Sequence, residues 1–191
     1  ELVAMDRSIG ALRKGLRKLD VEKDTLFWFT SDNGGLPGFK PTTTGGLRDF
    51  KGSMYEGGLR VPAIVSWPGT LPEGEVRSQF VTGCDWFPTL ARWAGARLPD
   101  KLDLDGRDID AVIHSADALS PHEHFFWTQD FSRNRNAPWA VRKGDWKLLH
   151  RPLDQVTPWK GGKAPRHFLV NLTKDPGETT NLAENEPARL A

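Results

Sequence analysis

The spacing of hydrophobic residues divides the chain into predicted elements. Near the amino terminus, apolar residues recur every three or four positions with Arg and Lys opposite, which predicts an amphipathic helix over 2–19. The apolar run 26–29 has no polar alternation and predicts a strand over 26–31 that is buried on both faces. A similar run over 63–67, ended by a Pro-Gly pair, predicts a second buried strand.

A short helix and a series of short strands follow along the chain. The apolar spacing predicts a helix over 85–94, with Asp85 as its N-cap and Gly95 as its C′ residue. After about residue 114, alternating apolar runs predict a small antiparallel sheet that contains a hairpin with a Gly loop. The runs are 125–127, 139–142, 146–149 and 168–170, the hairpin loop is 143–145, a turn lies at 175–178, and a last helix begins near 181.

The order of these elements indicates the fold class. A helix followed at once by a buried strand is half of a βαβ unit, which predicts an α/β fold with part of a mainly parallel sheet flanked by helices. We expect residues 1–113 to be the C-terminal part of an α/β domain and residues 114–191 to be a small antiparallel subdomain with the start of a terminal helix. Because the first strand of the βαβ unit is missing, we expect the chain to be a fragment of a longer protein.

The composition excludes several classes of protein. The 191 residues include 26 Lys and Arg against 25 Asp and Glu, and this near-neutral balance argues against a nucleic-acid partner. No apolar stretch approaches the roughly 18 residues that span a bilayer, so we expect no membrane partner. Cys84 is the single cysteine, which excludes an internal disulfide, and we expect it to be a small buried residue before the 85–94 helix.

The first candidate site lies where the run 26–29 ends. Asp32 and Asn33 come directly before Gly34 and Gly35. Ligands of open α/β sheets bind beyond the carboxyl ends of the strands, and carboxylate and amide oxygens suit Ca²⁺ or Mg²⁺. Two residues cannot complete such a site, so further ligands must come from elsewhere. The alternative is an Asx turn at the end of the strand.

Lys51 is the second candidate residue. It follows a polar loop over 34–50 that is rich in Gly, Pro and Thr, and it precedes Gly52. A loop of that length between two candidate elements favours a functional role. The ammonium group of Lys51 would act as a point charge on an oxyanion. The alternative is a solvated lysine in a polar loop.

The histidines offer a further candidate. His122 and His124 would face the same way in a strand and could clamp a transition metal. No third ligand with metal-like spacing accompanies them, so surface or packing roles are the alternative. His114, His150 and His167 are isolated in the sequence and carry no signal.

Several segments, in order along the chain, resemble the sulfatase family, the arylsulfatase-type branch of the alkaline-phosphatase superfamily. Residues 30–34 resemble the metal-binding strand end of that family, and residues 46–62, which include Lys51, resemble its sulfate-binding lysine segment. Residues 84–90, continuing to Gly95, are similar to the helix that follows. The segments that resemble the C-terminal subdomain are 140–148, 171–178 and 181–182.

The resemblance implies a sulfuric ester hydrolase with an alkaline-phosphatase-like fold. Asp32 and Asn33 would be two ligands of a Ca²⁺ or Mg²⁺ ion, and Lys51 would bind the sulfate group of the substrate. The family's nucleophile is a formylglycine hydrate, made from Cys or Ser in a Cys/Ser-x-Pro-x-Arg motif, that attacks sulfur and releases the alcohol.

The chain departs from the family at its most specific motif. Cys84 has no Pro two positions later, so the Cys/Ser-x-Pro-x-Arg motif does not occur. The family's paired acidic ligands and catalytic histidines are also absent. We therefore expect the nucleophile outside this chain, no catalytic residue within it, and no activity of these residues alone.

Two alternatives stay open beside the sulfatase reading. Phosphodiesterases and phosphonate hydrolases of the same superfamily more often place His after the Asp and bind Zn²⁺ or Mn²⁺, whereas Asn33 favours an oxygen-only site. A non-catalytic relative would bind a sulfated glycan without cleaving it. The expected partner is a sulfated small molecule or glycan, with specificity from the 34–50 loop, Trp127 and Trp139. Family habit suggests export to the periplasm, the lysosome or the outside.

Overall fold

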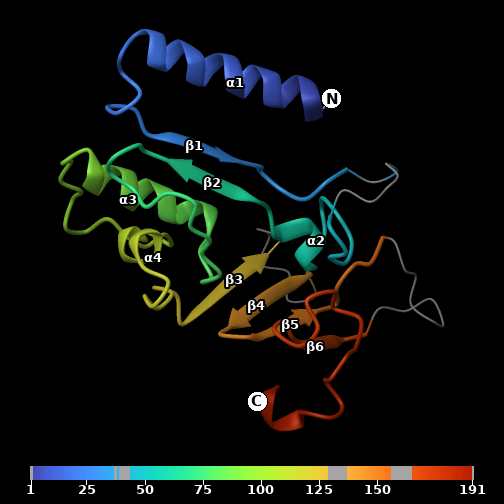
Figure 1. The fold of residues 1–191 in the computed structure, drawn as a ribbon. Coiled ribbons are helices and arrows are strands. Elements are labelled where there is room, and N and C mark those ends of the chain that lie inside the picture. The colour runs from blue at the N-terminus through green and yellow to red at the C-terminus, as the bar shows by residue number, and fades with distance from the viewer. Residues whose placement is uncertain (1, 37, 39–43, 129–136, 156–164, 191) are drawn as a thin grey trace. The chain divides into compact units, whose positions relative to one another are not determined.

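The computed structural model describes residues 2–36, 38, 44–128, 137–155 and 165–190 (Figure 1). Within these residues the predicted α/β class and the small antiparallel sheet are both present. No helix of the described part is both long and apolar enough to cross a bilayer. The elements in chain order are α1 (Leu2–Lys18), β1 (Phe27–Thr30), α2 (Glu56–Leu59), β2 (Ala63–Ser66), the 3-10 helix η1 (Gly83–Asp85), α3 (Trp86–Trp93), α4 (Asp110–His114), β3 (His124–Thr128), β4 (Trp139–Lys143), β5 (Trp146–His150), β6 (His167–Asn171) and the 3-10 helix η2 (Pro187–Arg189).

The chain forms two compact units, each built from two separate stretches of sequence. Unit 1 comprises residues 1–30 and 63–122, and unit 2 comprises residues 31–62 and 123–191. The 31–62 stretch, which carries Asp32, Asn33 and Lys51, therefore belongs to the same unit as the C-terminal sheet. The division of the chain at residue 114 into part of a catalytic domain and a C-terminal subdomain stays a prediction.

In unit 1, β1 and β2 pair with each other in antiparallel register, from Phe27 opposite Ser66 to Thr30 opposite Ala63. The expectation that both strands are buried on both faces is wrong for the described residues. Phe27 is half-buried, Trp28 is 36% exposed and the first half of β2 is exposed. Each strand has one partner among the described strands, so its faces are only partly covered. The predicted amphipathic helix α1 is present and contains no buried residue.

The region around Asp85 is held by one fully buried carboxylate. The predicted helix is present as α3, but Asp85 does not cap it in the way expected, because the chain already turns into η1 one residue after Thr82. The Asp85 carboxylate accepts hydrogen bonds from the backbone N–H of Thr82 (2.6 Å) and Arg107 (2.8 Å), and its Oδ1 lies 2.7 Å from Nε2 of His122. The carboxylate thus joins three segments of unit 1.

The end of α3 and the core beside it follow the predicted pattern. Gly95 adopts a φ of +68°, and its N–H donates to the carbonyl of Arg92, as expected of a glycine C′ residue. Trp86 packs with Ile109 and Val112 in the core of unit 1. Cys84, which we expected to be buried, is exposed, and Asp85 is the buried residue of η1.

Unit 2 is organised around the four-stranded antiparallel sheet β3-β4-β5-β6, which confirms the predicted series of short strands. The β4–β5 hairpin turns through Gly144 with a φ of +55°, as the Gly loop predicted. One face of the sheet packs on side chains from the stretch that precedes α2. The core of the unit consists of Met54, Tyr55, Ala140, Leu149, Phe168, Val170 and Leu172.

The last predicted helix does not form where it was expected. The Asn181 side chain accepts the N–H of Leu169 (3.0 Å) and donates to the carbonyl of His167 (3.0 Å). Leu182 also donates its N–H to the carbonyl of Leu169. These bonds attach Asn181 and Leu182 to β6, and the chain then makes a single turn over 183–185 in place of a helix. Only the short 3-10 helix η2 follows within the described residues.

We expect Asp85→Ala to destabilise the full-length protein by about 3 kcal/mol, because the substitution leaves buried donors without their acceptor. Urea denaturation followed by tryptophan fluorescence measures this change. The control is Asp100→Ala, whose carboxylate is 85% exposed in a surface ion pair and should change the stability by less than about 0.5 kcal/mol. Equal effects of the two substitutions would contradict the structural role of Asp85.

Candidate functional site

Asp32 and Asn33 form a tight turn at the start of unit 2. The side-chain Nδ2 of Asn33 donates to Asp32 Oδ2 at 2.6 Å, and the Ser31 hydroxyl donates to the main-chain carbonyl of Asn33 at 2.8 Å. An Asx turn at Asp32 would use the N–H of Gly34, but that N–H donates to the carbonyl of Gly58 at 3.0 Å. The two side chains are therefore held next to each other, with the Asp32 side chain exposed.

Two glycines allow this turn to lie directly against α2. A β-carbon on Gly34 would overlap the carbonyl oxygen of Gly57, and a β-carbon on Gly57 would overlap the carbonyls of Arg48 and Asp49. The N–H of Gly57 donates to the Arg48 carbonyl at 2.8 Å. The absence of a side chain at both positions thus lets three backbone segments of unit 2 meet at hydrogen-bond distance.

Lys51 is attached through its backbone to the same turn. Its N–H donates to the carbonyl of Gly35 at 3.0 Å, and its own carbonyl accepts a hydrogen bond from the side-chain Nε2 of Gln155 at 3.3 Å. The Lys51 side chain is exposed. The structure therefore brings the three predicted site residues together, since Gly34 and Gly35 link the Asp32–Asn33 pair to the Lys51 segment. Part of the intervening 34–50 loop lies outside the described residues.

Below this surface, unit 2 contains a buried cluster of three charges. The ammonium of Lys147, in β5, is fully buried and lies 2.8 Å from Glu56 Oε1 and 3.0 Å from Glu178 Oε1. Glu178 Oε2 also accepts the backbone N–H of Glu56 at 2.5 Å. Burial raises the pKa of Glu178 from 4.5 to about 6, although Lys147 acts in the opposite direction. The cluster joins the sheet, α2 and the 175–178 turn.

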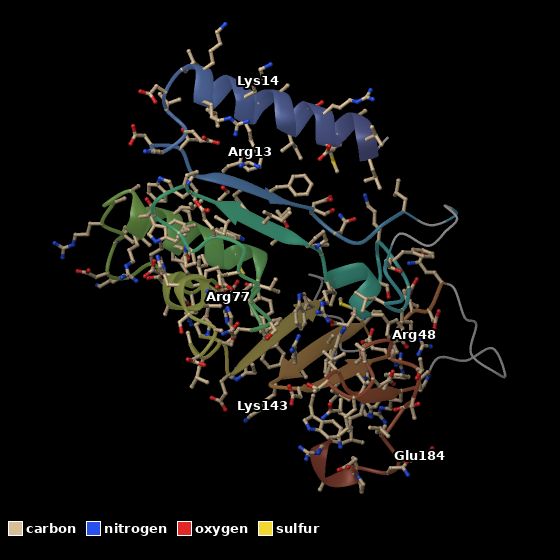
Figure 2. All side chains as sticks on the ribbon, viewed as in Figure 1. Arg13, Lys14, Arg48, Arg77, Lys143 and Glu184 are labelled. Carbon is tan, nitrogen blue, oxygen red and sulfur yellow. The ribbon has the colours of Figure 1, made fainter. Side chains whose placement is uncertain are left out.

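Arg48 anchors the other end of the Lys51 segment. Its guanidinium pairs with the Asp154 carboxylate, and Nη1 donates to the main-chain carbonyl of Glu178 at 2.6 Å. The group also lies over the rings of Tyr55 (4.3 Å) and Phe168 (5.1 Å), where it gains cation–π attraction. Figure 2 shows the Arg48 side chain among the C-terminal segments of the unit.

Two further ionisable groups beside Arg48 are shifted by burial. Asp49 has a positive φ of 63° and accepts backbone N–H bonds from Phe50 (3.0 Å) and Gln155 (3.3 Å). Burial raises the pKa of the Asp49 carboxyl, and a bond from Ser53 opposes this rise. Burial likewise raises the pKa of the Tyr55 hydroxyl. Asp49 and Tyr55 are thus buried groups on either side of the exposed Lys51 in the sequence.

The histidine clamp considered at positions 122 and 124 is not formed, and His122 has a packing role. His122 precedes β3 and is bonded to Asp85 in unit 1, whereas His124 belongs to unit 2. The structure instead pairs His150 with His167 across β5 and β6, with ring centroids 5.3 Å apart, and His150 stacks on Trp139 at 5.1 Å. Burial, then the charges around it, lowers the pKa of His150. A prediction of the pairing register of β5 and β6 would have placed His150 opposite His167.

The donor set fits only part of a metal site. Among the residues that the structure describes, no three His, Cys, Asp or Glu side chains gather closely enough to hold a metal ion. Asp32 and Asn33 nevertheless offer oxygens from adjacent, partly exposed side chains, which suits a hard cation that takes its other ligands elsewhere. Asp32 and Asn33 therefore fit a cation site of oxygen ligands to which other residues also contribute.

Comparison with known proteins identifies the family. The Sulfatase family model matches residues 1–96. The chain is 34% identical to a sulfatase of Formosa agariphila over 97% of its length. It belongs to the sulfatase family. It is also 32% identical to arylsulfatase A of Bos taurus over 96% of its length. The chain spans 35% and 38% of these two relatives, so it corresponds to about a third of a sulfatase.

Solved structures share the fold of the chain. Ps i-CgsB matches 99% of the chain with a TM-score of 0.80 and 30% identity, and the chain covers 39% of that protein. The same protein has been solved in complex with k-i-k-neocarrahexaose. A phosphonate monoester hydrolase of Agrobacterium radiobacter matches 96% of the chain with a TM-score of 0.67 and 25% identity, and the chain covers 36% of it. The alkaline-phosphatase-like fold expected from the sequence is thereby confirmed.

Substitution of Gly34 should disrupt the joined backbone. We expect Gly34→Ala to destabilise the full-length protein by at least about 2 kcal/mol, because the new methyl group overlaps the carbonyl of Gly57. The control is Gly10→Ala in α1, where nothing lies within 4 Å of the added carbon and alanine favours the helix by about 1 kcal/mol. Chemical denaturation compares the two, and a neutral Gly34→Ala would contradict the close approach.

The raised pKa of Glu178 makes a prediction about stability and pH. Because the pKa of Glu178 in the folded state exceeds the ordinary value of 4.5, protonation of Glu178 favours the folded state. The stabilisation that this provides is greatest below about pH 4.5 and is lost as the pH rises through 6. The shift corresponds to about 2 kcal/mol. We therefore expect the stability of Glu178→Gln, relative to the wild-type protein, to improve by up to that amount between pH 4 and pH 8. A difference that does not change with pH would contradict this assignment.

Proposed function

We propose that the described residues form one wall of the active site of a sulfate ester hydrolase. The observation that carries the proposal is the backbone connection between two candidate elements in a member of the sulfatase family. The N–H of Lys51 donates to Gly35, and the N–H of Gly34 donates to Gly58, so the acidic turn and the lysine segment are parts of one rigid arrangement. An oxygen pair and an ammonium group held in this way suit an anionic ester.

Asp32 and Asn33 are proposed as two ligands of a Ca²⁺ or Mg²⁺ ion. Both cations take oxygen ligands, and the pair supplies only oxygens toward a cation. The side-chain Nδ2 of Asn33 donates to Asp32 Oδ2, so the side-chain oxygen Oδ1 is the atom that Asn33 would offer to a cation. When bound, such an ion acts as a Lewis acid on the ester. The remaining ligands would come from sequence outside these residues.

Lys51 is proposed to bind the sulfate oxygens. Its ammonium group is a compact charge with three donors, and it can stay bonded to oxygen as negative charge grows during displacement of the alcohol. Its backbone N–H and carbonyl are both bonded, so the segment loses little freedom when the substrate binds. The residue therefore positions the ester and stabilises its charge.

The nucleophile is proposed to lie outside this chain. The expected group is a formylglycine hydrate, and its Cys/Ser-x-Pro-x-Arg motif does not occur in the 191 residues. Cys84 is an unsuitable substitute, because the residues after it lack the motif's Pro and Arg. We therefore propose that these residues alone do not hydrolyse sulfate esters, whereas the longer protein does.

The proposed substrate is a sulfated glycan or a smaller sulfate ester. One structural relative is described in complex with k-i-k-neocarrahexaose, and another, BT4656, in complex with its substrate D-glucosamine-2-N,6-O-disulfate. Those ligands support a sugar substrate here. Trp127 and Trp139 lie at the paired ends of β3 and β4 but on opposite faces of the sheet. Trp127 packs against the core of unit 2, so Trp139, which stacks on His150, is the aromatic side chain proposed to pack against a sugar ring.

The test is Lys51→Met in the full-length protein. We expect kcat/KM for an aryl sulfate to fall by about 10²–10³-fold, because one charge-stabilising donor is removed. Inhibition by inorganic sulfate should weaken in parallel. The matched control is Lys174→Met, an exposed lysine of the same unit, which should leave both values unchanged. Unchanged hydrolysis by Lys51→Met would overturn the role of this residue.

A second experiment separates the alternative functions. The similarity to a phosphonate monoester hydrolase makes phosphonate and phosphate ester hydrolysis the second candidate. Paired assays on sulfate and phosphonate esters, with metal analysis of the purified full-length protein, decide between them. Preferred phosphonate turnover with bound Zn²⁺ or Mn²⁺ would replace the sulfatase proposal. Binding of a sulfated glycan with no turnover of any ester would indicate a non-catalytic relative.

A further inference from the structure

The segment that carries Lys51 is a closed loop with two anchored ends. It begins at Arg48 and ends at Glu56, and it is closed by the bond from the N–H of Gly57 to the Arg48 carbonyl at 2.8 Å. Lys51 lies between the two ends, with an exposed side chain. The position of its ammonium group therefore depends on what holds Arg48 and Glu56.

One residue from the far end of the chain contacts both ends. The main-chain carbonyl of Glu178 accepts a bond from Nη1 of Arg48 at 2.6 Å. Its carboxylate accepts the backbone N–H of Glu56 at 2.5 Å. The Glu178 side chain is fully buried, and its backbone has a positive φ of 51°, a conformation that non-glycine residues rarely adopt. Such backbone conformations persist only where surrounding contacts enforce them.

The negative charge of Glu178 connects this loop to the sheet. Its Oε1 lies 3.0 Å from the ammonium of Lys147, and the same ammonium lies 2.8 Å from Glu56 Oε1. Lys147 is in β5, between β4 and β6, and is therefore held by strand pairing on both sides. The carboxylate thus fastens the end of the loop to the most constrained part of unit 2.

We propose that Glu178 is a positioning residue for Lys51: it clamps both ends of the 48–56 loop against the C-terminal sheet and so holds the lysine where the sulfate binds. This inference rests on the proposed role of Lys51. It assigns to the C-terminal turn a part in the reaction, although no atom of Glu178 contacts the substrate. The main-chain carbonyl fixes the first end of the loop, and the carboxylate fixes the second.

The test is a double-mutant cycle in the full-length protein, with the variants Glu178→Gln, Lys51→Met and both together. Glutamine keeps the size and an acceptor for the Glu56 N–H, but it removes the charge that pairs with Lys147. We expect Glu178→Gln alone to lower kcat/KM for an aryl sulfate about 10-fold, and to have less than about a twofold effect when Lys51 is already Met. A residue that acts through Lys51 has nothing left to position in that background.

The matched control is Asp85→Asn, which alters an equally buried carboxylate of unit 1 that is bonded there to Thr82, Arg107 and His122. Any loss it causes should multiply with the loss from Lys51→Met, because the two act independently. Multiplying losses for Glu178→Gln would mean a general structural role and would overturn the proposal. Where Glu178→Gln does not yield folded protein, Glu178→Asp, which keeps the charge at a shorter reach, takes its place with the same expectation.

Amide hydrogen exchange separates this inference from the proposed function. In Glu178→Gln, the amides of Glu56 and Gly57 should exchange at least about 10-fold faster, while those of α3 keep their rates. If Lys51→Met leaves sulfate ester hydrolysis unchanged, the proposed function fails, and faster exchange would still support the clamp. Unchanged exchange at Glu56 and Gly57 overturns the clamp whatever the activity.

Discussion

The buried ammonium group of Lys147 is the constraint on which unit 2 depends. An unpaired charge in a protein interior costs several kcal/mol, so this lysine is tolerated only where carboxylates meet it. Glu56 and Glu178 supply them from α2 and from the turn after β6. A sheet, a short helix and a distant turn must therefore converge on one point before the unit reaches its lowest free energy.

The backbone contacts around the glycines follow from that convergence. Once α2 is held against the sheet, the carbonyls of Gly57 and Gly58 face the turn that contains Gly34, and only a residue without a side chain fits there. The positions of Asp32 and Lys51 are thus set by main-chain bonds. Side-chain flexibility in the exposed groups can then adjust to a ligand without moving the framework beneath them.

The elements that follow from local pattern were predictable, and those that depend on distant partners were not. The helix α1, the strands of both sheets and the Gly144 hairpin have clear periodicity or turn residues. Asp32 and Asn33 were predicted as candidates because they offer oxygens at the end of a strand, and Lys51 because it lies between a Gly-rich loop and Gly52. The family assignment was confirmed. Lys147 and Glu178 were missed, because a charged residue in a strand or a turn is normally solvated and their partners are far away in sequence. The helix predicted at Asn181 failed for a related reason, since side-chain bonds to β6 outweighed local propensity.

The arrangement of unit 2 also determines when its parts can assemble during synthesis. Glu56 lies 91 residues before Lys147 and 122 residues before Glu178, and Arg48 lies 106 residues before Asp154. All of unit 1 after β1 is made in the interval. The Lys51 segment must leave the ribosome long before its C-terminal anchors Lys147, Asp154 and Glu178 exist, so it lacks these contacts until the C-terminal turn emerges. A truncation that removes the C-terminal turn would therefore leave the Lys51 segment, although it was translated much earlier, without contacts that hold it in place.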